Sequence, residues 1–323
     1  MNNEVLVSIV IPVYNRENYI SECVNSALNQ TYKNLEVIVT DNLSTDKTWQ
    51  ILIDLAKKDS RLKIFQNEQN IGPVRNWKKS IDLASGKYTN ILWSDDILNP
   101  QFIEKAIVYL ENDENVGFVF TKAEIFSQTK AFSNIELFCT GANSGTYNSD
   151  TFIKGVFRTK TFEGKFPYSP ACALFRAKAL KKNTIVEITN NYNIDFSREA
   201  IGNDLLMYLL TCLDYSKFGF LNEILVYFRS HEGSISTISE KKLDLIYNIV
   251  KAQYLQNNIN RFSIEDQIVY NTNLKIMLIS NKQNKYAIHK IDQFYRPITS
   301  KYNKLTVLKE TLKYHIKPLI GLK

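Results

Sequence analysis

The sequence predicts an α/β protein built on a mostly parallel sheet, and two observations lead to this prediction. Short β-branched, apolar runs alternate with longer amphipathic segments through the first 120 residues. The connections between them are short, which implies right-handed crossovers and therefore parallel strands. The composition agrees, because 44% hydrophobic and 23% charged residues are typical of a folded globular chain.

The first predicted strand is VLVSIVI at 5–11, a continuous β-branched run typical of a buried parallel strand. Four more strands are expected at 35–40, 62–67, 87–94 and 116–120. In Rossmann-like sheets, ligands bind at the carboxyl ends of the strands. Three of these ends carry polar residues, in PVYN, DNLSTD and WSDD, so we expect them to converge on one edge.

The predicted helices lie between these strands. Residues 16–29 place apolar side chains at helical spacing, and the next helix follows three candidate N-cap residues, Ser44, Thr45 and Asp46. A third helix at 72–85 ends before Gly86. The fourth, at 99–112, is expected to open on Asn99 as cap and Pro100 as first helical residue.

The pattern loosens after residue 120, as expected for a mixed sheet with long loops. A strand followed by a helix is expected at 169–180, an apolar helix at 203–213 and a strand within 223–236. From about residue 240 the sequence is mostly helical and rich in Lys and Asn. We therefore divide the chain into a domain at 1–240, with halves 1–120 and 121–240, and a helical extension at 241–323.

The net charge of +7 is unevenly distributed. Residues 241–323 hold 15 Lys and Arg against 5 Asp and Glu, whereas the remainder holds 25 against 28. A partner for the basic excess should therefore be sought at the C-terminal extension. Because no aromatic–basic strand motif accompanies it, nucleic acid is not an expected partner.

The cysteines and the N-terminus indicate the compartment. Cys23, Cys139, Cys172 and Cys212 are far apart and form no CxxC pair, which favours reduced thiols over disulfides or zinc. The N-terminus has no basic region before its apolar run, and no stretch of about 18 apolar residues occurs. We expect a cytoplasmic protein without membrane spans.

Two long segments resemble family 2 glycosyltransferases, which are inverting nucleotide-sugar enzymes with the A-type glycosyltransferase fold. They read VSIVIPVYNRENYISECVNSALNQTYKNLEVIVTDNLSTDKT and NEQNIGPVRNWKKSIDLASGKYTNILWSDDILNPQFI. The resemblance is strong over 5–120, looser over 165–236 and absent after 240. It implies that 1–120 binds a nucleotide-sugar donor, expected to be a UDP-sugar. It also implies that 121–240 binds a glycan or lipid-linked acceptor of bacterial surface-polysaccharide synthesis.

Asp95 and Asp96 are adjacent carboxylates at a predicted strand end, where they repel each other. The resemblance implies that Mn²⁺ or Mg²⁺ joins them to the donor diphosphate. The family's usual DxD pattern has Trp93 at its first position here, which leaves Asp95 as the expected metal ligand and Asp96 as a ligand or its support. Arg229 and His231 resemble the family's Arg-x-His loop. This implies that His231 is a ligand of the cation or of the diphosphate, and that Arg229 neutralises phosphate charge. The competing interpretation of the Asp pair is a turn or helix cap.

The resemblance also assigns nucleotide-binding residues. Asp41 would accept a hydrogen bond from the uracil N–H, which favours uracil over cytosine, although it could instead cap a loop. Asn42 stands where the family often has a second Asp. Asn70, Gly72 and Arg75 form an NxGxxR stretch. Gly72 would let the backbone approach the ligand, and Arg75 would bind phosphate or ribose. The competing interpretation is that this stretch is an ordinary start of a helix. The full nucleotide-binding set is Pro12, Tyr14, Asn15, Asp41, Asn70, Gly72, Arg75, Ser94 and Arg229.

Asp204 opens the helix NDLLMYLL and resembles the family's catalytic base, which takes the proton from the acceptor hydroxyl. The family has an acidic pair here, and Asn203 replaces its first member. A plain helix cap is the competing interpretation, because Asp is common in a first helical turn.

Two other functions are considered. A nucleotidyltransferase would need a Gly-rich, basic phosphate loop near the N-terminus, and IPVYNRENY has none. A non-catalytic nucleotide-sugar binder would not need Asp204 beside Asp95 and Asp96.

Residues 304–319 predict a helix with an apolar stripe of Leu305, Leu308, Leu312, His315, Ile316 and Leu319, flanked by Lys304, Lys309, Lys313 and Lys317. Such a helix suits an anionic membrane interface, which would make the protein peripheral on the inner face of the membrane. The alternative is that the stripe packs on the rest of the protein.

Overall fold

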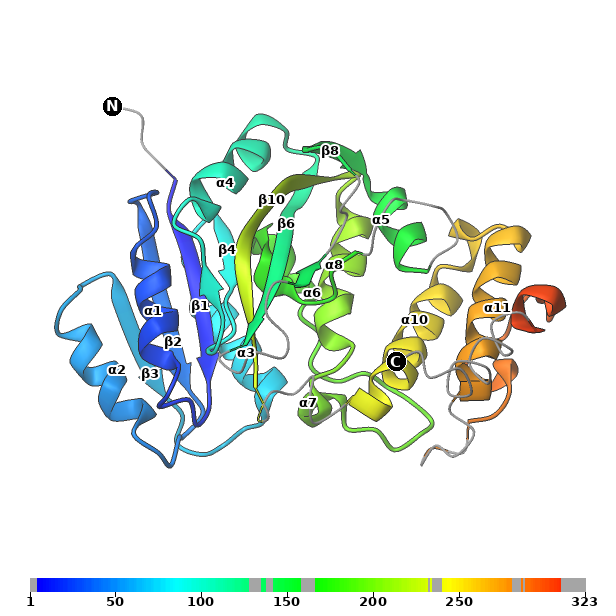
Figure 1. The fold of residues 1–323 in the computed structure, drawn as a ribbon, viewed down its shortest axis with the longest axis horizontal. Helices are drawn as coiled ribbons and strands as arrows, with labels where there is room; N and C mark the ends of the chain where they lie inside the picture. The colour runs from blue at the N-terminus through cyan, green and yellow to red at the C-terminus, as the bar shows by residue number, and fades with distance from the viewer. Residues whose placement is uncertain are drawn as a thin grey trace. The chain divides into compact units, whose positions relative to one another are not determined.

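The structure is a computed structural model that describes residues 5–127, 135–137, 142–157, 166–231, 233, 240–280, 286 and 288–308 (Figure 1). The chain divides into two compact units. The first comprises Met1–Phe152 and Phe162–Thr237, and the second comprises Ile153–Thr161 and Ile238–Lys323.

The first unit is built on a sheet of ten described strands. Eight of them follow the order β3-β2-β1-β4-β9-β6-β10-β5, while β7 pairs with β6 and β8 with β10. Their bounds are β1 Val7–Val13, β2 Leu35–Asp41, β3 Leu62–Gln66, β4 Tyr88–Ile91, β5 Ile97–Leu98, β6 Val116–Ser127, β7 Ile135–Leu137, β8 Gly145–Asn148, β9 Ala173–Arg176 and β10 Lys217–Ser230.

The long pairings of the sheet are parallel, which confirms the predicted fold class. β3, β2, β1 and β4 are parallel neighbours, and β6 runs parallel to β10 through the middle of Figure 1. The short strand β9 lies antiparallel between β4 and β6, so the fifth predicted strand does not pair with the fourth. All seven residues of β1 are buried, as the β-branched run at 5–11 predicts, and all seven of β2 are buried as well, including Glu36 and Asp41.

Helices cover the sheet. α3 packs on β1 and β2 and also on α6 and α7, α6 packs on α8, and α4 packs on β6, β9 and β10. The bounds are α1 Ile20–Leu28, α2 Thr48–Ala56, α3 Pro73–Leu83, α4 Phe102–Asn112, α5 Ser149–Val156, the 3-10 turn η1 Pro170–Cys172, α6 Ala177–Asn183, α7 Phe196–Glu199 and α8 Asn203–Asp214.

The first helix begins later than its periodicity predicts, at Ile20 instead of residue 16. Asn15 has a φ of 51°, and the backbone N–H groups of Asn15 and Arg16 donate to the side chains of Ser44 and Thr48. These bonds hold the segment after β1 against the segment after β2. The helix therefore starts only after Arg16 has been fixed in a loop.

Three other predicted boundaries were wrong. α4 starts at Phe102 and not at Pro100. The Asn99 N–H donates to Leu225 O in β10, and the Asn99 side chain accepts from the Gln101 N–H, so both residues lie before the helix. α2 has Lys47 at its N-cap, although Asp46 accepts from the Thr48 N–H. The predicted strand within 223–236 begins earlier and ends at Ser230.

The second unit is helical, as predicted for the chain after residue 240. α10 (Glu240–Asn257) packs on α11 (Ile264–Ser280), one 3-10 turn lies between them at Ile259–Arg261, and another follows α11 at Ile291–Gln293. The Phe157 ring packs against the rings of Phe262 and Tyr270, and Lys154 forms an ion pair with Asp266 at 3.0 Å. The end of α5 therefore belongs to the core of this unit.

Glu36 is a buried carboxylate at the amino end of β2, away from the candidate site. It accepts hydrogen bonds from Ser8 Oγ at 2.7 Å and from Lys63 Nζ at 2.6 Å. Burial opposes its ionisation, but these bonds and those from Ser85 outweigh burial and lower its pKa from 4.5 to about 2. A depressed carboxylate pKa stabilises the fold above its unfolded value and loses this contribution as pH falls towards the folded value.

We expect Glu36→Gln to lower the free energy of unfolding at pH 7 by on the order of 2 kcal/mol. The difference from the parent protein should shrink between pH 4.5 and about 2. Urea unfolding across this range measures it. A difference that stays constant down to pH 2 would contradict the assignment.

Among the described residues, no helix is both long and apolar enough to cross a bilayer. Cys23, Cys172 and Cys212 are free thiols, and Cys139 lies outside the described residues.

Candidate active site

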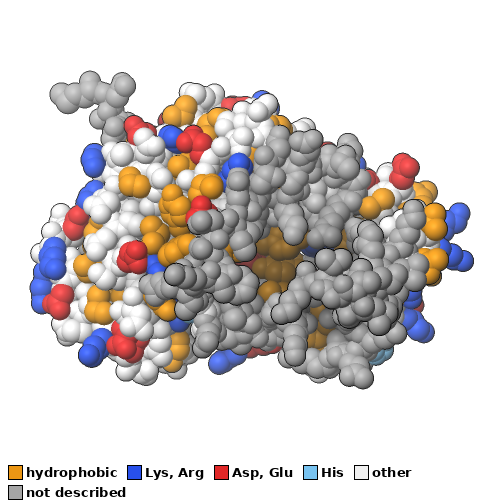
Figure 2. All heavy atoms as spheres, viewed as in Figure 1, with side chains coloured by type: hydrophobic (Ala, Val, Ile, Leu, Met, Phe, Trp, Pro, Cys, Tyr) orange, Lys and Arg blue, Asp and Glu red, His pale blue; other side chains and the backbone are white. Residues whose placement is uncertain are grey.

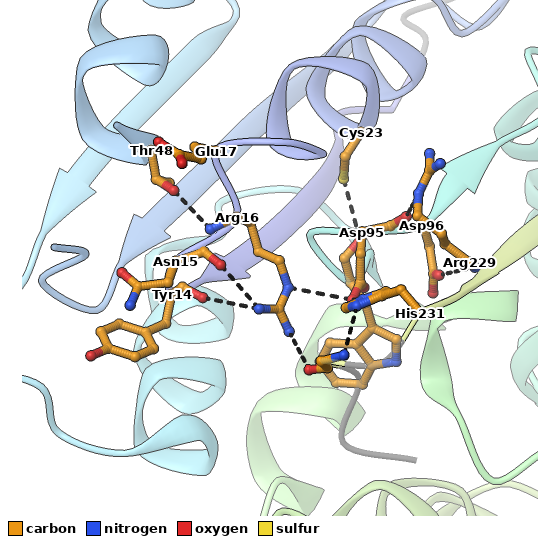
Figure 3. A network of polar contacts seen from close by, with 12 residues as sticks. Tyr14, Asn15, Arg16, Glu17, Cys23, Thr48, Asp95, Asp96, Arg229 and His231 are labelled. Atoms are coloured by element: carbon orange, nitrogen blue, oxygen red, sulfur yellow. Dashed lines mark hydrogen bonds and ion pairs between the residues drawn. The ribbon is translucent and has the colours of Figure 1, made fainter. Parts of the chain in front are cut away.

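The carboxyl ends of β1, β2 and β4 meet at one edge, as predicted (Figure 3). The Asn15 side chain bonds to Thr45 in the loop after β2, and the Arg16 side chain reaches Asp95 after β4. Arg16 Nη2 also donates to Gly233 O, which lies beyond the end of β10. Four chain segments that are distant in sequence therefore enclose one polar site.

Asp95 and His231 form the centre of this site. Asp95 Oδ2 lies 2.8 Å from His231 Nε2 and 3.4 Å from Arg16 Nε. The side chains of Asp95 and His231 are each 14% exposed, so the pair is largely screened from solvent yet reachable. His231 Nδ1 accepts from the Gly233 N–H, and the Tyr19 ring packs beside the imidazole at 4.8 Å.

Asp96 faces away from this pair. It is buried, and its Oδ1 accepts a hydrogen bond from the backbone N–H of Arg229. The Arg229 side chain is 2% exposed, donates through Nε to the Asp95 carbonyl and pairs with Glu22 at 2.6 Å. Its guanidinium also lies over the rings of Tyr19 and Phe126. In this structure Arg229 therefore braces the segment that carries the two aspartates.

The environment moves the two carboxyl groups in opposite directions. Burial, together with the charge of Asp95, raises the pKa of Asp96 well above its usual value. Burial also opposes ionisation of Asp95, but the hydrogen bond from His231 and the charge of Arg16 lower its pKa. Adjacent carboxylates are tolerated here because one is stabilised as the anion and the other holds its proton more strongly.

The predicted nucleobase residues lie on the loops after β1 and β2. Pro12 is buried in β1, Tyr14 is 41% exposed, and Asn15 joins the two loops. Asp41 is fully buried and accepts hydrogen bonds from Ser44 and from Gln66 Nε2. It lies at the same edge as Tyr14 and Asn15 and shapes the loop after β2.

Side-chain amides hold the NxGxxR loop in place. Asn42 Nδ2 donates to Asn70 Oδ1, and Asn42 Oδ1 accepts from Asn67 Nδ2 and from the Ile71 N–H. A carboxylate at position 42 could not donate the first bond, which explains why an amide suits this position. The loop then reaches Gly72, whose φ of 84° and ψ of 161° lie in a region that only glycine adopts readily.

Arg75 and Ser94 have different surroundings. Arg75 pairs with Glu187 and donates to Ser197 Oγ at 2.6 Å, which ties α3 to the segment before α8. Ser94 is buried directly before Asp95.

Trp93 connects the Asp95 segment to α8. Its ring packs on Trp77 at 4.7 Å, and its Nε1–H donates to Ser169 Oγ at 2.8 Å. The carbonyl of Ser169 accepts from Tyr208 Oη at 2.8 Å. Tyr208 lies one helical turn after Asp204. Ser169 thus joins the strand end that carries Asp95 to the helix that carries Asp204.

Asp204 lies in the first turn of α8 and is 8% exposed. Its Oδ1 accepts from the N–H groups of Gly202 and Leu205. The preceding Asn203 is fully buried and donates to the carbonyls of Ile185 and Val186, which a carboxylate could not do.

Sequence reasoning missed Arg16, Glu22 and Ser169. Arg16 directly follows the polar end of a predicted strand, and this position was a signal, but we assigned it to the predicted helix at 16–29. Glu22 and Ser169 gave no signal, since their partners Arg229 and Trp93 are 207 and 76 residues away in sequence.

A divalent cation fits two of the predicted ligands. Asp95 Oδ2 and His231 Nε2 lie 2.8 Å apart, and this oxygen and nitrogen are the two protein atoms that would hold the ion. Among the described residues no group of three or more His, Cys, Asp or Glu side chains is arranged around one ion. Its remaining ligands would therefore have to come from substrate phosphate and water, as is usual for Mg²⁺.

The chain is similar to known glycosyltransferases in sequence and in fold. An uncharacterized glycosyltransferase of Haemophilus influenzae is 27% identical over 98% of this chain and 93% of its own. Glycosyltransferase GlyG of Streptococcus pneumoniae serotype 4 is 30% identical over 71% of this chain and 72% of its own. The solved structure of S. aureus TarS 1–349 in complex with UDP-GlcNAc has a similar fold, with a TM-score of 0.58 at 19% identity over 84% of this chain and 80% of that one.

The model of the family described as Glycosyl transferase family 2 matches residues 8–184, which is more than half of the chain. This match and the likeness to GlyG show the family of the chain. The protein belongs to glycosyl transferase family 2 and is a glycosyltransferase.

Proposed function

We propose that the protein transfers a sugar, with inversion and with a divalent cation, from a UDP-sugar to a glycan or lipid-linked acceptor in bacterial surface-polysaccharide synthesis. The observation that carries this proposal is the Asp95–His231 pair, which lies 2.8 Å apart beside the Tyr14–Asn15 loop. Membership of a glycosyltransferase family disfavours both the nucleotidyltransferase and the non-catalytic binder.

In this proposal Asp95 and His231 hold the cation, Mn²⁺ or Mg²⁺, which would neutralise the diphosphate as it leaves. Asp204 takes the proton from the acceptor hydroxyl while that oxygen attacks the anomeric carbon, which inverts the configuration. The bonds from Gly202 and Leu205 hold Asp204 Oδ1 in place. The Trp93–Ser169–Tyr208 connection supports the relative placement of Asp95 and Asp204.

Asp41 supports uracil as the base. A carboxylate offers about four acceptor positions, and among the described residues Asp41 accepts from three donors, the Ser44 N–H, the Ser44 hydroxyl and Gln66 Nε2, so one more donor can be accepted. Uracil has an N3–H to give and cytosine does not. Tyr14, exposed on the neighbouring loop, offers a flat face to the base.

Two measurements test the proposed function. Calorimetric titration should show UDP binding that is stronger with manganese than with EDTA, and stronger than CDP binding. A panel of nucleotide sugars should then show hydrolysis of a UDP-sugar donor. Equal UDP affinity with manganese and with EDTA would remove the cation from the proposal, and turnover of only non-uridine donors would remove UDP.

We also propose that the second unit attaches the enzyme to an anionic membrane on its cytoplasmic side. In the described helix at 304–308, Leu305 and Leu308 are 62% and 56% exposed, and Ile298 nearby in sequence is 65% exposed. Figure 2 shows hydrophobic side chains beside Lys and Arg at the edge of this unit. Residues 309–319 of the predicted stripe lie outside the described residues.

Liposome co-sedimentation tests this attachment. We expect the full chain to bind anionic vesicles at low salt and to leave them at high salt, since each lysine near the surface contributes about 1 kcal/mol. The double substitution Leu305→Ser and Leu308→Ser should weaken binding, while Val108→Ser, at an exposed apolar position of α4, should not. Negligible binding of the parent protein at low salt would contradict the proposal.

A further inference from the structure

Arg16 is a cation within the candidate site to which no function has yet been given. Its Nη1 donates to Asn15 O at 3.0 Å and to Tyr14 O at 3.4 Å, and its Nη2 donates to Gly233 O at 3.4 Å. Its Nε lies 3.4 Å from Asp95 Oδ2. The guanidinium therefore touches the nucleobase loop, the expected metal ligand and the segment after His231 (Figure 3).

The contacts of Arg16 hold its side chain in place but leave its hydrogen-bonding capacity only partly used. Three of the four are 3.4 Å long, at the weak end of hydrogen-bond geometry. Its Nε is buried and makes no hydrogen bond to any described residue. The side chain as a whole is 22% exposed, so a ligand in the site can reach the group. A better anion would displace these contacts at little cost.

Two other arginines, both predicted to bind the nucleotide, are already engaged. Arg229 is 2% exposed and is held by Glu22 and the Asp95 carbonyl, while Arg75 pairs with Glu187 and Ser197. Among the described residues, the only carboxylate paired with Arg16 is Asp95, and His231 lies closer to that carboxylate, at 2.8 Å. A divalent ion on Asp95 and His231 would compete for that carboxylate and leave the guanidinium in need of an anion.

We propose that Arg16 binds the diphosphate of the donor, exchanging its ion pair with Asp95 for phosphate oxygens. This proposal rests on the proposed function. A planar guanidinium matches phosphate through paired N–H groups, and charge-assisted bonds of this kind are the strong ones. Its place between the Tyr14–Asn15 loop and Asp95 is where a chain of two phosphates must run from base to cation. Arg16 would then favour a diphosphate over a nucleoside alone and share the charge of the leaving group.

Calorimetric titration of uridine, UMP and UDP with manganese tests the proposal. We expect Arg16→Gln to weaken UDP binding by about tenfold to a hundredfold, the loss of one charged hydrogen-bonding group, and to leave uridine binding unchanged. Arg16→Lys should lie between the two, because it keeps the charge without the fork. Arg61→Gln is the matched control, since Arg61 pairs with Asp59 just before β3, at the opposite edge of the sheet.

The possible outcomes separate the hypotheses. The proposal would be overturned if Arg16→Gln bound UDP as tightly as the parent protein. It would also be overturned if this variant lost uridine and UDP affinity equally, because Arg16 would then only support the loop that holds the base. Arg16→Lys, which keeps the charge, tests the same point if the glutamine variant unfolds. If the parent protein bound no UDP, the proposed function and this inference would both be overturned. If the parent bound UDP and Arg16→Gln bound it equally well, only this inference would be overturned.

Discussion

The variant Asp204→Asn should lose sugar transfer by about 10²- to 10⁴-fold, the usual contribution of a general base, while its UDP affinity stays within about twofold. An amide has no basic oxygen for the acceptor proton, but it retains an acceptor for the N–H groups of Gly202 and Leu205. Folding and donor binding should therefore survive. Rates of transfer measured at saturating donor, alongside UDP titration, separate the two effects.

Asp214→Asn provides the matched control for this experiment. Asp214 ends the same helix and pairs with Lys182, far from the first turn that holds Asp204. We expect this variant to transfer sugar at the parent rate. Turnover of Asp204→Asn within tenfold of the parent would exclude Asp204 as the base and leave it as the helix cap that its two backbone bonds describe.

Asp95→Asn should abolish the gain in UDP affinity that manganese gives the parent protein, and reduce transfer accordingly. The substitution keeps the size of the side chain but removes the charge that the structure directs at His231, 2.8 Å away. Asp95→Ala should act in the same way. Titration of UDP with manganese and with EDTA measures the gain in each variant.

Asp96→Asn distinguishes the two adjacent carboxylates. Its Oδ1 accepts from the Arg229 N–H, and its pKa is raised by burial, so an uncharged side chain suits its surroundings. We expect this variant to keep a response to manganese that Asp95→Asn loses. A lost response in Asp96→Asn together with a retained one in Asp95→Asn would reverse the assignment of the direct ligand.

Much of the fold was predictable because burial leaves a periodic trace in the sequence. β1 and β2 lie inside the sheet and are rich in β-branched apolar residues, whereas the edge strand β3 alternates and exposes Phe65. A strand followed by a helix was predicted within 169–180, where β9 and α6 lie, but the insertion of β9 between β4 and β6 left no trace, since its neighbours are chosen by long-range pairing. The start of α1 was predicted too early for a related reason. The N–H groups of Asn15 and Arg16 donate to Ser44 and Thr48, which are about 30 residues away in sequence.

Strand ends and motif spacing are local properties of the chain, and they were enough to identify a family 2 glycosyltransferase with acidic residues at one sheet edge. Folding alone decided that Asp95 faces His231 while its neighbour Asp96 faces Arg229. It also decided that Arg16 enters the site and that Ser169 links Trp93 to Tyr208. Side chains at a turn follow no period, so their directions depend on partners that only folding brings together.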